Sequence, residues 1–152
     1  MVKPMNESTN MDGVEKLSLI VHSPDIGKIH YALVLAAGAA AINKPVTMFF
    51  TMGASTVLSK NNGDVAPWHN MPANGFANGL EMDNSLKQRA MADFQTLFQA
   101  CIDLGVRFMV CEMGLLFAKI EQTDLRDDIN IEITGVVTFL NDASKDGSII
   151  FI

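Results

Sequence analysis

The sequence is poor in cysteine, and its two cysteines form neither a metal-site pattern nor a disulfide framework. Two cysteines and three histidines in 152 residues show no zinc-type spacing. Small secreted domains that depend on disulfides carry many more cysteines than this, whereas unpaired thiols are typical of a reducing compartment. We therefore expect a cytoplasmic protein that folds without a metal ion or a disulfide.

Long apolar runs are also missing. The longest run, Tyr31 to Ile42, is shorter than the ~18 residues that are needed to span a bilayer. Residues 1–13 lack the apolar core of a secretory signal peptide. The sequence thus predicts a protein that is neither exported nor partnered with a membrane.

Basic charge is scarce and scattered. Eleven Lys and Arg residues against seventeen Asp and Glu residues give a net charge of −6. A nucleic-acid-binding domain normally shows a clustered basic surface, so we expect no nucleic acid as a partner. No Gly-x-Gly-x-x-Gly motif follows an apolar run, so the sequence predicts no dinucleotide cofactor.

Apolar residues, in contrast, are abundant. Hydrophobic residues make up 49% of the chain and charged residues only 18%, which is apolar for one small domain. The segment from Tyr31 to Ile42 is apolar all round, and a helix without a polar face is covered on both sides. We expect a homo-oligomer that uses this helix as an interface, because so short a chain has little else to cover it.

Short apolar runs alternate with helix-like segments along the chain. Residues 1–13 carry no such pattern and are interpreted as a flexible arm before a single domain, 14–152. The alternation predicts an α/β layered fold of the flavodoxin or Rossmann kind, with about five mostly parallel strands and helices on both faces. Strands are predicted at 17–22, 46–51, 106–111, 129–134 and 148–152, and helices at 23–42, 83–104, 112–120 and 135–143, with a short helical turn at 124–128.

Cys111 is the main candidate for chemistry. It ends the apolar run that starts at Val106, and thus lies at the carboxyl edge of a predicted parallel sheet, where ligands collect. The first N–H groups of the next helix would favour its thiolate, the nucleophilic form, whereas Glu112 would disfavour it. The alternative is that Cys111 is a small buried apolar residue without reactivity.

Cys101 lies on the apolar stripe of the preceding predicted helix, together with Phe94 and Leu97. We expect it to be shielded from solvent. The strand after Gly105 carries the chain ~20 Å away from the turn, so the two thiols are predicted to lie beyond the Cα separation of about 7 Å that a disulfide allows.

Other residues are candidates for supporting or gating roles: His22, His30, Trp68, His69, Glu112 and Lys119. The two histidines near the first strand and the charged residues after Cys111 would help to set the thiolate fraction. The remaining Trp and His lie in the Asn-, Gly- and Pro-rich segment 61–80, and long loops of this kind often act as lids. For each residue the alternative is an ordinary packing, capping or surface role.

The order of these segments resembles the DsrE/DsrF/TusD-like family of small sulfur-relay proteins, and most of all its DsrE2-like branch. The resemblance runs from Leu17 to Ile152 and is carried by SPDIGKIHYALVLAAGAAA, VTMFFTMGA, FMVCEM and GVVTFLNDA. It implies a sulfurtransferase-like activity in which Cys111 accepts sulfur as a persulfide. It also implies donor and acceptor proteins, and a dimer, trimer or hexamer.

Two functional hypotheses follow. In the first, the protein carries sulfane sulfur on Cys111 and requires no cofactor. In the second, the same fold is a non-catalytic oligomeric module that binds a ligand or a protein, and Cys111 is inert. Rapid alkylation of Cys111 at neutral pH favours the first hypothesis, and burial of its sulfur without an open path favours the second.

Overall fold

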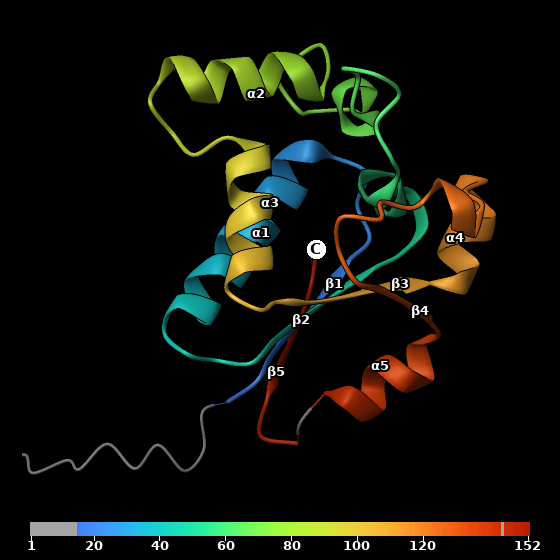
Figure 1. Cartoon of the computed structure of the whole chain (residues 1–152). Coiled ribbons are helices and arrows are strands. Elements are labelled where there is room, and N and C mark those ends of the chain that lie inside the picture. Colours follow the sequence, from blue (N-terminus) through green and yellow to red (C-terminus); the bar gives the residue numbers. More distant parts are fainter. Residues whose placement is uncertain (1–14, 144) are drawn as a thin grey trace, which may run out of the picture.

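Five parallel strands form one sheet in the order β4-β3-β2-β1-β5 (Figure 1). The strands are β1 (Leu17–Val21), β2 (Val46–Phe50), β3 (Arg107–Cys111), β4 (Ile131–Thr134) and β5 (Ser148–Phe151). The computed structural model describes residues 15–143 and 145–152, and the predicted arm at 1–13 lies outside them. The prediction of a single-domain α/β fold with five strands is confirmed.

In the described part of the chain, five α-helices and three short 3₁₀ segments connect the strands. The predicted turn at 124–128 is wrong, because the helical turn there is the 3₁₀ segment η3, which ends at Asp124. The α-helices are α1 (Ile26–Ala41), α2 (Gly79–Gln88), α3 (Phe94–Asp103), α4 (Glu112–Ala118) and α5 (Val136–Asp142), and the 3₁₀ segments are η1 (Met52–Leu58), η2 (Pro67–Asn70) and η3 (Gln122–Asp124).

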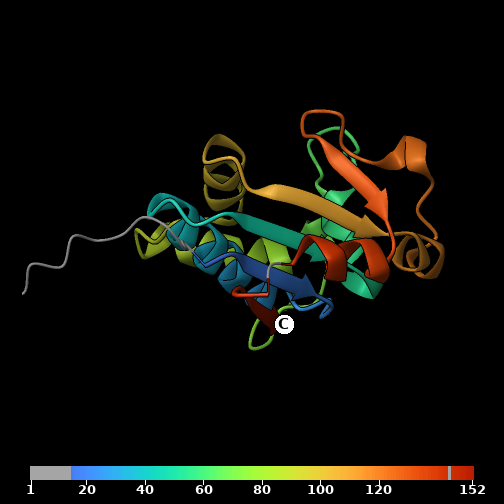
Figure 2. The same ribbon diagram turned by 90° about the horizontal axis from the view of Figure 1, so that it is seen from below.

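The connections cover the two faces of the sheet unequally. The chain steps from β1 to β4 in one direction and then returns to place β5 beyond β1. Because parallel crossovers are right-handed, this reversal puts α5 on the face opposite to α1 and α3. Figure 2 shows α5 as the helix that crosses the strands on the face toward the viewer.

The buried side chains form two clusters, one on each face. The larger cluster lies between the sheet and the α1 side and contains most of the apolar core. The smaller cluster consists of Phe49, Met109, Cys111 and Phe139, with Phe139 supplied by α5. Cys111 therefore belongs to the thinly covered face of the sheet.

Helix α1 begins later than the sequence suggests and is partly covered within the domain. The predicted helix starts at residue 23, whereas Asp25 is the N-cap in the structure, and its carboxylate accepts a hydrogen bond from the Lys28 backbone N–H at 3.1 Å. Helix α3 packs against α1, so part of the apolar surface that the sequence assigns to another subunit is buried here. Tyr31 and Ile42 remain exposed.

The predicted single helix at 83–104 is wrong: the structure has two helices, α2 and α3. Asn78 caps α2 several residues before the predicted start, and Asp93 caps α3. Asp83 lies inside α2, and its buried carboxylate accepts a hydrogen bond from the Phe94 N–H at 2.8 Å, which joins the two helices. The apolar spacing continues across the break, which is why periodicity alone does not reveal it.

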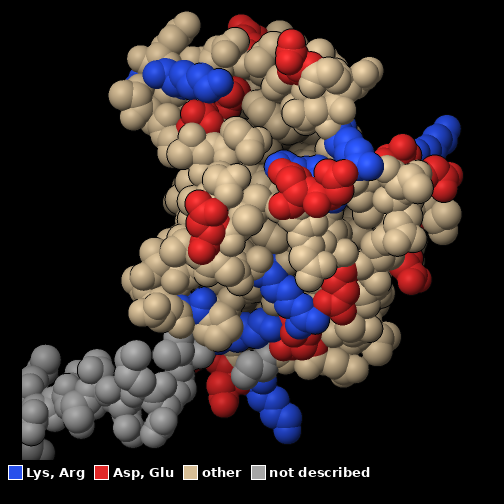
Figure 3. Space-filling view, in the orientation of Figure 1, with Lys and Arg blue, Asp and Glu red and all other residues tan. Residues whose placement is uncertain are grey.

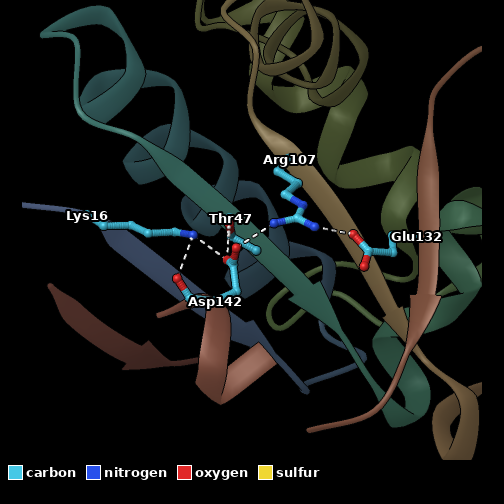
Figure 4. A network of polar contacts seen from close by, with 5 residues as sticks. All are labelled: Lys16, Thr47, Arg107, Glu132 and Asp142. Carbon is cyan, nitrogen blue, oxygen red and sulfur yellow. Dashed lines mark hydrogen bonds and ion pairs between the residues drawn. The ribbon is translucent and has the colours of Figure 1, made fainter. Parts of the chain in front are cut away.

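A polar network holds α5 on the sheet (Figure 4). Asp142 at the end of α5 pairs with Lys16 and Arg107 and accepts a hydrogen bond from the Thr47 hydroxyl at 2.9 Å. Arg107 also pairs with Glu132 of β4 at 2.5 Å. Burial by itself raises the pKa of Asp142, but the hydrogen bonds from Lys16 and Thr47 and the nearby positive charges outweigh it and lower that pKa.

Candidate functional site

Cys111 is the last residue of β3 and the N-cap residue of α4. Its side chain lies in the small cluster with Phe49, Met109 and Phe139, and the residue is 7% exposed. The backbone thus leaves the sheet at this residue and enters α4 at once. This is the predicted position of Cys111, at the carboxyl edge of a parallel sheet.

A tight contact fixes the path of the chain after Cys111. Helix α4 packs against η1, the segment that follows β2. A Cβ atom added at Gly114 would lie 2.6 Å from the Met52 backbone nitrogen and 2.8 Å from the Ser55 Oγ. Met52 itself has φ 49°, a left-handed conformation that is costly for a residue with a side chain. The Ser55 hydroxyl is fully buried and has no hydrogen-bond partner among the described residues.

Cys101 lies on the other side of the sheet. It is completely buried in the larger cluster, and its Sγ donates to the Leu33 carbonyl at 3.5 Å. Burial raises the pKa of the Cys101 thiol to about 12. Both cysteines are free, which confirms the prediction that they do not pair. The two thiols are therefore separate in space and differ in surroundings.

His22 lies beside the carboxyl end of β1. The strand register sets Val21 level with Phe50, and Phe50 level with Val110, so His22 follows β1 at the level where Cys111 ends β3. Two strand spacings separate them, or about 10 Å. The His22 ring contacts Phe151 with centroids 5.3 Å apart, and both residues line a cavity of about 550 Å³ at the carboxyl ends of β1 and β5.

His30, Trp68 and His69 make contacts away from Cys111. His30 Nε2 donates to the Ala92 carbonyl at 2.9 Å from the buried side of α1. Trp68 is buried in the larger cluster, where its ring packs on Phe94 with centroids 4.6 Å apart. The Nδ1 of His69 accepts a hydrogen bond at 3.2 Å from the N–H of Ala66, the residue that precedes η2. All three therefore have structural partners, and Trp68 anchors the 61–80 segment.

Glu112 and Lys119 lie at the two ends of α4. Glu112 is exposed in the first turn, directly after Cys111. Lys119 is the C-cap in a left-handed conformation and lines a cavity of about 490 Å³ together with Lys60 and Pro67. Of the charged candidates, only Glu112 is next to Cys111 in the chain.

The family of this protein is identified by a match over nearly the whole chain and not by a single residue. The model of the DsrE/DsrF/DrsH-like family matches residues 14–151. The chain belongs to this family. Sequence and fold comparisons agree on the extent of the match.

One sequence relative is the uncharacterized protein YrkE of Bacillus subtilis (strain 168), which is 24% identical over 159 residues. The match covers 91% of this chain and 97% of that protein. The structure of MTH1491, a protein of unknown function from Methanobacterium thermoautotrophicum, has a TM-score of 0.55 at 12% identity. It covers 91% of this chain and 99% of the MTH1491 chain, and so supports the fold of the DsrE-like domain.

Charge is distributed without a dominant patch on the face of this DsrE-like domain seen in Figure 3, where basic and acidic side chains are interspersed. Among residues 15–143 and 145–152, no group of three or more His, Cys, Asp or Glu side chains is arranged to hold a metal ion. No helix in that described part is long and apolar enough to cross a membrane.

Sequence reasoning missed the residues that support the chain after Cys111. In this DsrE-like fold, Met52 and Ser55 lie against Gly114 because β2 and β3 are neighbours whose carboxyl ends share one edge. The TMGAS segment after β2 was a usable signal, since it follows a buried strand and contains small residues. Phe139 was harder to find, because nothing local to α5 indicates which strand it covers.

Proposed function

We propose that this DsrE-family protein is a small sulfur carrier that accepts sulfane sulfur as a persulfide on Cys111. Membership in the family supports a role related to sulfur relay. The observation that carries the proposal is the position of Cys111, at the end of β3 where α4 begins. Cys101 is unsuited to the role because it is fully buried and burial raises its pKa to about 12.

The transfer needs only thiol chemistry. The Cys111 thiolate attacks the outer sulfur of a donor persulfide, a new S–S bond forms on Cys111, and the donor sulfur leaves as a thiolate. An acceptor thiolate then attacks the outer sulfur of the Cys111 persulfide and releases Cys111 as a thiolate. Each step moves one sulfur atom without net oxidation or reduction, so no electron-carrying cofactor takes part.

The partners in this proposal are proteins. A donor that bears a persulfide and an acceptor that bears a thiol meet the Cys111 edge of the sheet in turn, and the carrier itself is a homo-oligomer. The free state of both cysteines agrees with a reducing compartment, and we place the protein in the cytoplasm.

A specific observation favours the second hypothesis, a non-catalytic binding module. Cys111 is only 7% exposed and lies among Phe49, Met109 and Phe139. A thiol in apolar surroundings behaves as a small hydrophobic residue. The two hypotheses differ in whether the Cys111 sulfur reacts in the folded protein.

Cyanolysis separates them. The purified protein is incubated with polysulfide, desalted and treated with cyanide, which removes a sulfane sulfur as thiocyanate and leaves a thiolate. We expect about one thiocyanate per chain from the wild type and from Cys101→Ala, and none from Cys111→Ser. Absence of thiocyanate from the wild type would support the binding module.

A further inference from the structure

Helix α5 lies over the face of the sheet that carries Cys111. Strand β4 sets Thr134 beside Cys111, and one residue separates Thr134 from α5. The helix then runs back toward the amino ends of the strands, where Asp142 pairs with Lys16 and Arg107 (Figures 2 and 4). The first turn of α5 thus lies near Cys111, and its last turn lies at the opposite edge of the sheet.

One side chain of α5 closes the space around Cys111. Phe139 is the buried residue of this helix, and its ring stacks on Phe49 of β2 with centroids 4.9 Å apart. These two rings and Met109 enclose Cys111, which is 7% exposed. An attacking group needs more access to the sulfur than this. Of the residues in the cluster, Phe139 is the one that does not belong to the sheet.

The rest of α5 is weakly held. A helix of seven residues is unstable alone in water, and Gly135, which precedes α5, has no side chain that could cap it. Apart from the Phe139 ring, α5 is held by the polar network of Asp142. Segments with few buried side chains open locally while the rest of a protein stays folded. Five of the seven residues are exposed: Val136, Val137, Thr138, Leu140 and Asn141.

A buried hydroxyl on the same face favours such opening. Ser18 is 1% exposed, and its hydroxyl has no hydrogen-bond partner among the described residues. It lies level with Thr47 on the neighbouring strand, so both side chains point to the face where Thr47 donates to Asp142 of α5. Burial of an unpaired hydroxyl is unfavourable. Release of α5 from this face lets water reach Ser18 and removes that penalty.

We infer that α5 is a movable cover over Cys111, and that the thiol reacts from an open conformation in which Phe139 has left the sheet. The Asp142 network at the far end of the helix stabilises the closed conformation. The larger cluster, which contains Cys101, lies on the opposite face and stays packed when α5 opens. Only the reaction of the exposed thiol rests on the proposed function, because α5 limits the access of any reagent.

Iodoacetamide labelling of both cysteines in the full chain tests the cover. Asp142→Asn removes the charge that holds the end of α5, and Asp127→Asn, which breaks an exposed ion pair with Lys60, is the matched control. We expect Cys111 to be labelled at least ~5-fold faster in Asp142→Asn than in the wild type and the control, because the closed conformation loses its ion pairs. Cys101 should stay unlabelled in all three proteins, because it becomes accessible only on global unfolding.

A direct effect of the Asp142 charge on the thiol is small. Its partner Arg107 starts β3 and Cys111 ends it, so four residue steps, or ~13 Å, separate the two ends of the strand. This separation exceeds the Debye length of about 8 Å at physiological salt. Hydrogen exchange provides a readout that does not involve the thiol. The amides of α5 are expected to exchange faster than those of α3, and faster still in Asp142→Asn.

Phe139→Leu provides a second variant, because it keeps an apolar side chain but loses the stacking on Phe49. It should also speed the labelling of Cys111 alone. An equal Cys111 rate in the wild type and Asp142→Asn would overturn the cover, as would exchange of α5 no faster than that of α3. A joint rise in labelling of Cys101 and Cys111 would assign access to global unfolding and would also overturn it.

Failure of the cover and failure of the proposed function are distinguishable. If labelling and exchange behave as expected but the wild type releases no thiocyanate on cyanolysis, the cover stands and the sulfur-carrier proposal fails. If the wild type releases thiocyanate but Asp142→Asn leaves the labelling rate of Cys111 unchanged, the sulfur carrier stands and the cover is wrong.

Discussion

Gly114 packs against the backbone of Met52 so closely that no side chain fits between them. An added Cβ would lie 2.6 Å from the Met52 nitrogen and 3.0 Å from the Thr51 Cα. The contact joins the first turn of α4 to the segment after β2, three residues beyond Cys111. The conformation of the chain after Cys111 thus depends on Gly114 in the first turn of α4.

Gly114→Ala is expected to destabilise the protein. The added methyl group meets backbone atoms that cannot rotate away, and overpacking of this kind costs about 1 to 3 kcal/mol. Gly38→Ala is the matched control, because Gly38 lies within α1 and an added Cβ there meets nothing within 4 Å. That control should gain about 0.5 to 1 kcal/mol from helix propensity. Urea unfolding measures the change in unfolding free energy for both variants. Equal changes would contradict the close packing of Gly114 on Met52.

Asp142→Asn is expected to weaken the attachment of α5. The amide cannot neutralise Lys16 and Arg107, and loss of hydrogen bonds to charged groups costs about 1 to 3 kcal/mol at pH 7. Because the pKa of Asp142 is lowered in the folded state, its contribution is present above the unfolded Asp value of about 3.9. It is then lost as the pH falls through the folded pKa.

Urea unfolding of the wild type and Asp142→Asn from pH 7 to pH 2 checks this pH dependence. The difference in unfolding free energy should shrink below pH ~4. Asp127→Asn serves as a control, because the exposed Asp127 carboxylate forms only a surface ion pair, with its Oδ2 3.8 Å from the Lys60 Nζ. Loss of this ion pair should change the free energy of unfolding by less than ~0.5 kcal/mol. A difference that stays constant down to pH 2 would show that the Asp142 charge is not responsible.

The two cysteines are expected to differ in their reaction with iodoacetamide. In the native protein at pH 7.5, Cys101 should stay unlabelled, because it is fully buried and its pKa of about 12 leaves almost no thiolate. Cys111 should be labelled first, and Cys101 only after unfolding in guanidinium chloride. Peptide mapping locates the label. Labelling of Cys101 at the rate of Cys111 would contradict the assigned environments.

The fold was largely predictable from the sequence because its strands are short apolar runs between helical segments. Buried parallel strands are largely apolar on both faces, so β1, β2 and β3 stand out as short apolar runs. The break between α2 and α3 did not stand out, because it depends on the Asp83 carboxylate and the Phe94 N–H. A contact between two residues eleven positions apart leaves no periodic signal.

The candidate site was predictable only in part. The position of Cys111 followed from the end of an apolar run, which is local information. Its neighbours Phe49 and Phe139 come from β2 and α5, and their approach depends on strand order and crossover direction. The same holds for His30 and Trp68, whose partners Ala92 and Phe94 come from other parts of the chain.

The most direct test of the account is to find which cysteine gains sulfur. The wild type, Cys111→Ser and Cys101→Ala are incubated with a persulfide donor and digested without reductant. Mass spectrometry then searches for a gain of about 32 Da, one sulfur atom, on each cysteine peptide. The account predicts the gain on the Cys111 peptide of the wild type and of Cys101→Ala, and none in Cys111→Ser. A gain on Cys101 in Cys111→Ser, or no gain in any of the three proteins, would contradict it.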